Sequence, residues 1–329
     1  MFNEFMNRDD YFFIHNHVTD IEQVPDIMPD VHARILQYSP GQLSGESVCL
    51  ELPEILVYRN SAQRGLQIEL APQTDWFGVM IPDYVSDSFN WMGQAFETDT
   101  ILLLPPSEVA QYSLPLSWSS IEFFIETPLL KKLGLLSIDG TPNYNTKIYQ
   151  TTVSKKIRNA LLNKGRQLLK MAELDHPDLH DPFFQVQHKE QLVELLQRVL
   201  PPSGNDITMN FNTSSSHKLI SRAQELIEQF IQSGQPLSIP DLANRLDVHE
   251  RKLYNVFQKT LGISPYAWGH IVRMHQFRQQ AIESSEKHGA ITKIASELGF
   301  NNMSHFSEQF KRLFHETPRQ FLSRSISPS

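Results

Sequence analysis

Near the C-terminus, apolar residues recur with helical spacing in two successive copies. Within each copy they follow the i, i+3, i+4, i+7 pattern that lines one face of a short helix. The first copy contains Ile239, Leu242, Ala243, Leu246, Val248, Leu253, Phe257 and Leu261, then Ser264, Pro265 and Trp268. The second contains Ile291, Ile294, Ala295, Leu298, Phe300, Phe306, Phe310 and Phe314, then Thr317, Pro318 and Phe321. The offset is 52 residues for the first five positions and 53 afterwards, so one extra residue in a turn explains the change.

Each copy predicts two short helices joined by a tight turn. The turns fall at Asp247 and Gly299, and glycine adopts a positive φ more readily than aspartate does. Asn301 or Asn302 can cap the second helix of the second copy, whereas His249 is a poor cap at the equivalent place. A helix, a tight turn and a second helix form the helix-turn-helix motif, whose second helix enters the major groove of DNA.

The two copies are joined by residues 266–284, whose apolar positions form one stripe and predict a single long helix. At about 1.5 Å per residue, this helix can hold the two motifs roughly one turn of DNA apart. Two helical hairpins that pack a core and bind nothing would share the pattern of a single copy. The repetition at this spacing favours DNA reading.

Residues from about Lys218 to Arg324 resemble the DNA-binding domain of AraC/XylS-type transcription regulators. The segments LSIPDLANRLDVHERKLYNVFQKTLGISPYAW and ITKIASELGFNNMSHFSEQFKRLFHETPRQF carry the resemblance, which covers about a third of the chain. It implies an all-α domain over residues 218–325, with helix-turn-helix motifs at about 238–261 and 291–314. In that family each second helix enters one of two successive segments of the major groove.

The resemblance places the base-reading positions on the second helix of each motif. They are Arg251, Tyr254, Asn255, Asn302, Met303, Ser304, Ser307 and Glu308. Arg, Asn and Ser can read base edges, Met can touch a thymine methyl, and Glu can accept a hydrogen bond from cytosine. Many relatives carry a basic residue where Glu308 stands. The candidate phosphate contacts are Lys252, Lys259, Arg273, Lys293, Lys311 and Arg312.

The net charge of −8 argues against nucleic acid only if the chain is taken as a whole. Residues 218–329 hold 14 Lys and Arg against 10 Asp and Glu, whereas residues 1–217 hold 15 against 27. The C-terminal part therefore has a net charge of +4 and the remainder −12, which places a phosphate-facing surface in the C-terminal part. A net charge of +4 is modest, so we expect salt-sensitive binding that is weak for one copy of the domain.

Residues from about 34 to 126 contain short runs of β-branched and aromatic residues, and Pro, Gly, Asn or Asp lies between most of these runs. This pattern predicts short strands. The expected strands are Ser47–Leu52, Ile55–Asn60, Gly65–Leu70, Trp76–Ile81, Ser88–Gly93, Thr100–Leu104 and Ser120–Glu126. Strands of this kind suggest a barrel or a double-sheet sandwich. The predicted fold class is therefore α+β, with an N-terminal cupin-like β-barrel sensor domain, flanking helices and an all-α C-terminal domain.

The segment Tyr38–Pro82 resembles, in layout, the N-terminal domain of regulators related to the ethanolamine-utilisation regulator, a subgroup that responds to small metabolites. The residues that we expect in an effector pocket are Arg59, Trp76, Phe89, Trp91 and Trp118, although core packing is the commoner role of such aromatic side chains. No histidine lies between His32 and His176, so the barrel lacks the usual cupin metal ligands. His15 and His17 are expected to be a surface pair, and we predict no metal and no cofactor.

Residues 128–200 predict helices with two apolar faces. In the family such helices pack across a dimer interface, which implies a homodimer; covering the open face of the barrel is the alternative. Residues 1–200 are thus the expected effector-binding and dimerisation domain. Residues 201–217, rich in Pro, Ser, Asn and Thr, are the expected linker.

Function follows from these elements. We predict a DNA-binding transcription regulator, an activator controlled by a small organic effector, with RNA polymerase as a partner that the family implies. The alternative is a ligand- or protein-binding anti-activator of the same fold with weakened DNA binding. No catalytic motif is present, so no enzyme is expected. The single cysteine, Cys49, permits no intrachain disulfide, and no targeting or membrane-spanning segment is evident, so a cytoplasmic protein is expected.

Overall fold

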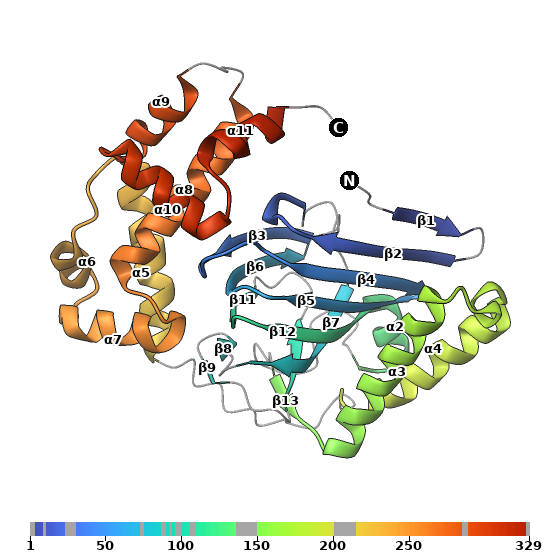
Figure 1. Cartoon of the computed structure of the whole chain (residues 1–329). Coiled ribbons are helices and arrows are strands. Elements are labelled where there is room, and N and C mark those ends of the chain that lie inside the picture. The colour runs from blue at the N-terminus through green and yellow to red at the C-terminus, as the bar shows by residue number, and fades with distance from the viewer. Residues whose placement is uncertain are drawn as a thin grey trace.

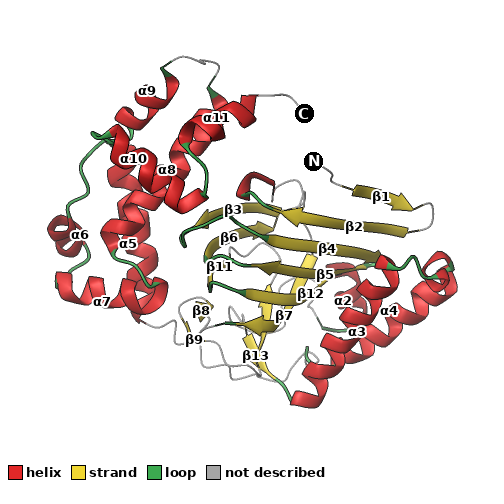
Figure 2. Ribbon diagram, viewed as in Figure 1, coloured by secondary structure: helices red, strands yellow, loops and turns green. Residues whose placement is uncertain are grey.

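The computed structural model describes residues 4–8, 11–23, 31–72, 76–86, 90–91, 94–95, 100–104, 110–135, 150–200, 215–284 and 289–326. An N-terminal part built mainly of strands is followed by a C-terminal part built of helices (Figure 1). Figure 2 shows the strands gathered in one block, with the helices of residues 155–197 on one side and those of residues 215–326 on another. The α+β class predicted from the sequence is confirmed. None of the helices in the described ranges is both long and apolar enough to cross a membrane.

Two antiparallel sheets form the N-terminal part. The larger sheet contains β1 (Glu4–Arg8), β2 (Tyr11–Val18), β4 (Gly45–Leu52), β5 (Ile55–Ala62), β7 (Trp76–Val85), β10 (Thr100–Leu104), β12 (Trp118–Glu126) and β13 (Gln150–Thr152). The smaller contains β3 (Val31–Gln37), β6 (Leu66–Pro72), β8 (Asn90–Trp91), β9 (Gln94–Ala95) and β11 (Ala110–Leu114). Their strand orders are β1-β2-β4-β5-β12-β7-β10-β13 and β3-β6-β11-β8-β9.

The larger sheet has two buried faces, because successive side chains of a strand point to opposite sides. Ile121 and Phe123 of β12 belong to a core that includes the helices of residues 155–197. Trp118 and Phe124 of the same strand belong to a second core, which lies between the two sheets. Cys49 is part of this second core, and burial raises the pKa of its thiol to about 12.

Helices α2 (Thr127–Lys132), α3 (Lys155–Glu173) and α4 (Pro182–Gln197) follow the strands. The apolar face of α3 packs on the larger sheet, as the covering alternative predicts. A Cβ atom at Gly165 would collide with Ile121, so the glycine allows α3 to approach the sheet closely. Short 3-10 turns, η1 (Ile21–Gln23) and η2 (Pro177–His180), complete the N-terminal part in the described ranges.

The C-terminal part is a series of helices with two separate cores. Its helices are α5 (Ser215–Gln232), α6 (Ile239–Arg245), α7 (Glu250–Leu261), α8 (Pro265–Glu283), α9 (Ala290–Glu297), α10 (Met303–Phe314) and α11 (Pro318–Ile326). The long helix α8 joins both cores. Its Trp268 and Val272 pack with α5, α6 and α7, and its Phe277 and Ala281 pack with α9, α10 and α11.

The N-terminal sheet begins earlier than the sequence predicted. β1 and β2 precede residue 34, where the first strands were expected, and together they form one edge of the larger sheet. In β2 the buried face includes Asn16, which breaks the simple apolar-in, polar-out alternation on which the prediction relied. Of the expected strand Ser88–Gly93, residues 90–91 form β8 and the remainder lies outside the described residues, as do residues 201–214 of the expected linker.

Candidate DNA-binding surface and its contact with the N-terminal domain

The first helical pair, α6 and α7, is shaped by its turn and its caps. Ser238 caps α6 by accepting a hydrogen bond from the Asp241 backbone N–H at 3.3 Å. Asp247 has φ +53°, in the left-handed region that reverses the chain between the helices. His249 at the start of α7 makes no side-chain cap, as expected from its sequence. The inner face of α7 is fully apolar, so its polar residues point outward.

The outer face of α7 carries the predicted reading residues of the first motif. Arg251, Tyr254 and Asn255 are all exposed, and 40% of the Tyr254 surface is accessible. Arg251 and Asn255 also line an open hollow together with the exposed Lys252. These side chains therefore form one polar surface at the N-terminal half of α7.

The second pair, α9 and α10, repeats this geometry, and its turn and cap residues are better suited to their positions. Gly299 in its turn has φ +81°, a conformation that glycine adopts without strain. The Asn302 side-chain oxygen accepts a hydrogen bond from the His305 backbone N–H at 3.0 Å, so Asn302 is the cap. Its amide nitrogen is left to donate outward, which keeps it in the set of candidate base contacts.

The remaining predicted reading residues of α10 differ in exposure. Ser304 and Glu308 are exposed, whereas Met303 and Ser307 are half-buried. Met303 also packs against the core of the second motif, so only part of its side chain faces outward. Glu308 lies on the outer face, where a carboxylate repels phosphate but can accept from a cytosine amino group.

Five of the six predicted phosphate contacts are exposed: Lys252, Lys259, Lys293, Lys311 and Arg312. Arg273 departs from the expectation, since it is only 9% exposed on α8. Burial also lowers the pKa of its guanidinium. The sequence places Arg273 on a long helix but does not show that both faces of this helix are covered. Sequence reasoning therefore could not recognise Arg273 as buried.

Comparison with known proteins agrees with this geometry. A family model described as a helix-turn-helix domain matches residues 242–324, which include the motif of α9 and α10 and most of the motif of α6 and α7. The C-terminal domain belongs to the AraC/XylS family. It is 28% identical over 114 residues to the HTH-type transcriptional regulator ArgR of Pseudomonas aeruginosa. It is 33% identical over 85 residues to the HTH-type transcriptional activator RhaS of Yersinia pestis.

These similarities cover only part of each protein. They cover 35% of this chain and 33% of ArgR, and 26% of this chain and 30% of RhaS. The chain thus spans about a third of the length of these curated relatives. A longer structural alignment, to the AraC-like transcriptional activator CuxR, covers 86% of this chain and 99% of CuxR, at 14% identity and a TM-score of 0.40. At this TM-score the alignment does not establish a shared arrangement of the two domains.

Among the predicted pocket residues that the structure describes, Arg59 does not lie with Trp76 and Trp118. Arg59 of β5 lies on the helix-covered side of the larger sheet, where it pairs with Glu46 and Glu173 at 2.9 Å each. Trp76 and Trp118 belong to the core on the opposite side, between the sheets. Phe89 and the Trp91 side chain lie outside the described part of the chain. A sheet therefore separates Arg59 from both described tryptophans.

The histidine pair predicted at the surface has a carboxylate neighbour. The His15 Nε2 atom lies 2.7 Å from Glu46 Oε1, and His17, which is exposed, lies beside it. The ligand atoms of these three residues lie within 4.8 Å of one another, a grouping that could hold a metal ion. The other Glu46 oxygen, however, pairs with Arg59. The positive charge of Arg59 disfavours a metal ion bound beside it.

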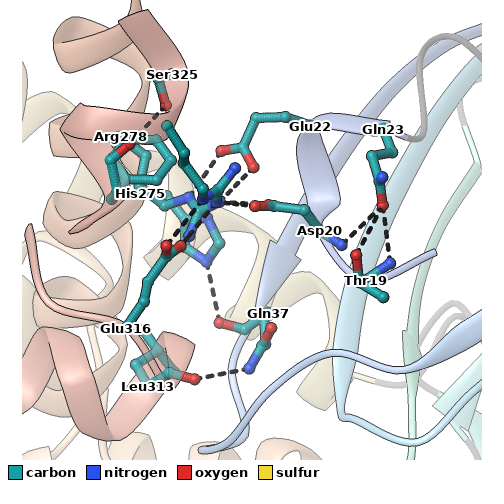
Figure 3. A network of polar contacts seen from close by, with 12 residues as sticks. Thr19, Asp20, Glu22, Gln23, Gln37, His275, Arg278, Leu313, Glu316 and Ser325 are labelled. Carbon is teal, nitrogen blue, oxygen red and sulfur yellow. Dashed lines mark hydrogen bonds and ion pairs between the residues drawn. The ribbon is translucent and has the colours of Figure 1, made fainter. Parts of the chain in front are cut away.

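A contact between the N-terminal domain and the AraC-type domain surrounds Arg278 of α8, whose side chain is 3% exposed. Figure 3 shows its guanidinium between Asp20, Glu22 and Glu316. Arg278 Nε donates to Glu22 at 2.7 Å, Nη1 donates to Glu316 at 3.2 Å, and Nη2 donates to Asp20 and Glu22. Arg324 of α11 joins the same network by pairing with Asp20 and Glu316.

Asp20 and Glu22 in this network affect each other's pKa. Burial and the neighbouring Glu22 raise the pKa of Asp20 from its usual 3.8 to about 6, against the influence of Arg278 and Arg324. Hydrogen bonds from Arg278 and Asp20 lower the pKa of Glu22 although burial opposes this. The network therefore holds the Asp20 proton more tightly than an exposed aspartate does.

The start of the loop after β3 reaches the C-terminal end of α10. The Gln37 side-chain amide donates to the Leu313 carbonyl at 2.8 Å, and the Gly41 backbone N–H donates to the same carbonyl at 3.0 Å. The Gln37 carbonyl accepts from His275 Nε2 of α8 at 3.0 Å (Figure 3). The contact therefore engages the end of α10 that is remote from Asn302.

A second group of contacts reaches α5, which packs against the first motif. Arg34 of β3 pairs with Glu228 of α5 at 2.9 Å, and Gln67 of β6 exchanges hydrogen bonds with Gln224 of α5. The β3 residue Leu36 is part of the core formed by α5, α6, α7 and α8. The N-terminal domain therefore contacts both halves of the AraC-type domain. The sequence could not indicate these pairings, because Asp20 and Arg278 are 258 residues apart.

Replacing His275 with glutamine is expected to make the chain more resistant to acid. Burial lowers the pKa of His275 to about 3 from its usual 6.5, so the folded chain excludes a proton that the unfolded chain binds below pH 6.5. This group therefore removes stability as the pH falls from 6.5 towards 3. Relative to the parent, His275→Gln should gain about 2 kcal/mol in unfolding free energy between pH 7 and pH 5.

Urea denaturation at both pH values measures this difference. Asp20 acts in the opposite direction, because its raised pKa makes the folded chain bind a proton between pH 6 and pH 3.8. The comparison with the parent cancels this contribution, and Asp20→Asn should show a steeper loss in acid than the parent. An unchanged difference between His275→Gln and the parent at the two pH values would contradict the burial of a neutral imidazole.

Proposed function

We propose that this protein is a transcription regulator that reads DNA with α7 and α10 and acts as an activator under the control of a small organic effector. Membership of the C-terminal domain in the AraC/XylS family supports DNA reading. The activator RhaS is among the relatives, which supports the sign of regulation. Effector control rests on the N-terminal domain being in contact with both halves of the AraC-type domain.

The single observation that carries the proposal is the exposure of polar side chains at the N-terminal halves of both second helices. Arg251 and Asn255 on α7, and Asn302 and Ser304 on α10, are all exposed although the two domains are in contact. The contact instead engages α5, α8, α11 and the C-terminal end of α10. A DNA duplex could therefore approach both helices without first displacing the N-terminal domain.

The domain contact offers a physical route for control. An effector shifts an equilibrium only by binding its two states with different affinities. Here the two states are the contact around Arg278 made or broken. One group of contacts holds α5, which packs against the first motif, and another holds the second motif. Breaking either group would therefore change how the two reading helices are held relative to each other.

Homodimerisation is part of the proposal, with paired half-sites on promoter DNA and RNA polymerase as the partner expected of an activator. Leu174, at the C-terminal end of α3, and Phe183 and Val186 on α4 are exposed to 65%, 69% and 40% of their surfaces. Large apolar side chains of this kind gain stability by being covered. They lie in the helical segment that the sequence assigned to a dimer interface.

DNA selection with the full-length chain tests the reading function. A random duplex pool should yield an enriched motif, and binding to it should weaken steeply as salt increases. Arg251→Ala should cost about 1–3 kcal/mol and relax specificity at about one base position. Lys252→Ala should weaken binding to all sequences by a similar factor and reduce the salt dependence by roughly one phosphate contact.

The matched control is Arg222→Ala, which removes one exposed cation from α5, outside both motifs. It should retain both affinity and specificity. If the pool yields no enriched sequence and no salt-dependent binding, the DNA-reading proposal fails. The anti-activator alternative, in which the fold acts through another protein, would then be preferred.

A further inference from the structure

One end of the larger sheet carries two histidines and a glutamate on a single face. His15 and His17 are two residues apart on β2, so their side chains point to the same side of the sheet. Glu46 of the neighbouring strand β4 lies directly opposite His17 in the register. All three lie on the side of the sheet that carries Val48, where the core with α3 and α4 forms, yet His17 is exposed and the other two are half-buried. The group is therefore accessible from solvent.

The three side chains lie close together. His15 Nε2 is 2.7 Å from Glu46 Oε1, and the ring centroids of His15 and His17 are 5.0 Å apart. The potential ligand atoms of all three lie within 4.8 Å of one another, and no other group of three His, Cys, Asp or Glu residues does so in the described part of the chain. Two ligands of one tetrahedral zinc ion lie roughly 3.3–3.6 Å apart, because each is about 2.0–2.2 Å from the metal. Small side-chain rotations therefore suffice to place all three on one ion.

The ligand types select the kind of ion. Imidazole nitrogens together with a carboxylate suit zinc and the neighbouring divalent transition metals, whereas magnesium and calcium prefer oxygen ligands. Two histidines and a glutamate, with water in the fourth position, form a known type of zinc site. The sequence showed only the two histidines, because Glu46 is 31 residues from His15 and reaches it through strand pairing.

Arg59 is the charge that opposes a metal here, and its own contacts limit this effect. Its Nη2 atom lies 2.9 Å from Glu46 Oε2 and 2.9 Å from Glu173 Oε1. Glu173 therefore balances the charge of Arg59 and leaves the charge of Glu46 for the ion. Arg59 holds Oε2 of Glu46, whereas Oε1 is the oxygen beside His15. A carboxylate that binds a metal is commonly held by such a hydrogen bond from a neighbouring side chain.

We propose that His15, His17 and Glu46 form a binding site for one divalent transition-metal ion of the zinc class. One nitrogen of each imidazole and Glu46 Oε1 bind the ion, and Arg59 acts as a positioning residue for Glu46. The site lies outside the DNA-reading helices and outside the core between the two sheets. It therefore goes beyond the function proposed above and does not depend on it.

The proposed metal site is close to the domain contact along the chain. His17 precedes Asp20 by three residues, and the backbone N–H groups of Thr19 and Asp20 donate to the side-chain oxygen of Gln23 at 2.8 and 3.0 Å (Figure 3). Asp20 then pairs with Arg278 of the AraC-type domain. An ion that ties β2 to β4 therefore fixes the strand end from which this turn leads to the contact.

Calorimetric titration of the metal-free full-length chain with zinc chloride tests the site. We expect one zinc ion per chain, with a dissociation constant in the micromolar range or below. Magnesium chloride should not bind under the same conditions, because the site offers it nitrogen ligands. Zinc should also slow amide hydrogen exchange in β2, in β4 and in the turn at residues 19–23.

Two variants locate the site. His17→Asn and Glu46→Gln each remove one ligand and should weaken zinc binding at least about tenfold. His17 is exposed, so His17→Asn tests the site even if Glu46→Gln, which also loses the pair with Arg59, is less stable. The matched control is His176→Asn, which removes an exposed histidine beside a single carboxylate, Asp178 at 3.7 Å, and keeps a residue that can cap η2.

The control should bind zinc as the parent does. Saturating zinc should raise the melting temperature of the parent and of the control but not that of His17→Asn. The metal-free parent and His17→Asn should melt at the same temperature, which separates loss of a ligand from loss of fold.

Three results would overturn the proposal: no zinc binding by the parent, undiminished binding by folded His17→Asn, or an equal loss of binding in His176→Asn. Slowed exchange confined to segments other than β2, β4 and the turn would also overturn it, because zinc would then be bound elsewhere. DNA selection with the same preparation is an independent measurement. A chain that selects a DNA sequence but binds no zinc would retain its regulator assignment and lose the metal site.

Discussion

Arg278→Met is expected to destabilise the chain by about 3–5 kcal/mol and to separate the two domains. Removing one partner of a buried ion-pair network leaves the opposite charges uncompensated. Here Asp20, Glu22 and Glu316 would lose the cation at their centre. Methionine retains much of the apolar volume that the Arg278 side chain presents to the rings of Phe314 and Phe321, 4.4 and 4.2 Å from its guanidinium carbon. Urea denaturation and the radius of gyration from small-angle scattering measure the two effects.

A second variant changes the residues that the N-terminal domain contributes to the same contact. Asp20→Asn combined with Glu22→Gln removes both N-terminal carboxylates but leaves Arg278 its pair with Glu316. This double variant should also expand the chain while leaving the helical core of the second motif intact. If Arg278→Met shows the parent's radius of gyration and denaturation midpoint, the contact contributes nothing to holding the domains together.

The helix-turn-helix motifs could be predicted because the information that forms them is local. The apolar positions of each motif lie within about 25 residues, and their periodicity predicts two short helices joined by a turn, as observed for α6 with α7 and for α9 with α10. The cap at Asn302 and the positive φ at Gly299 also follow from residue type. Arg273 shows the limit of this reasoning, since burial of both sides of α8 depends on distant packing.

The N-terminal domain was less predictable, for a physical reason. Whether Arg59 and Trp118 share a face depends on the alignment of β5 with β12, and strand alternation within one segment cannot supply that alignment. The pairing of β12 with β7 also shifts register at Ser119 and Ser120.

The pattern of residues within β2 explains why this strand was not predicted from the sequence. Its inner face holds Ile14 and Val18 on either side of Asn16, so its pattern lacks a clean alternation. A polar residue at a core position is an error in an ideal strand and is expected at functional sites. The segment that sequence reasoning passed over is therefore the one that leads into Asp20 and the domain contact.

Phe310→Ala is expected to unfold the second motif, at a cost of about 3–5 kcal/mol. Phe310 is completely buried, and its ring centroid lies 4.7 Å from that of Phe314, 5.5 Å from Phe277 and 5.7 Å from Phe306. The first motif has a separate core around Trp268 and should remain folded. DNA affinity should then fall to that of one motif, and the domain contact should loosen because Phe314 supports Arg278.

Tyr84→Ala is the control, because it removes an aromatic ring from a side chain that is 56% exposed. Its effect on unfolding should stay within about 0.5 kcal/mol. Urea denaturation measures both variants, and DNA binding separates partial from complete loss of the AraC-type domain. Equal stability of the two variants would show that the aromatic cluster is not what holds α10 against α8. Complete loss of all helical structure in Phe310→Ala would instead show that the two motifs fold as one unit, since α8 connects their cores.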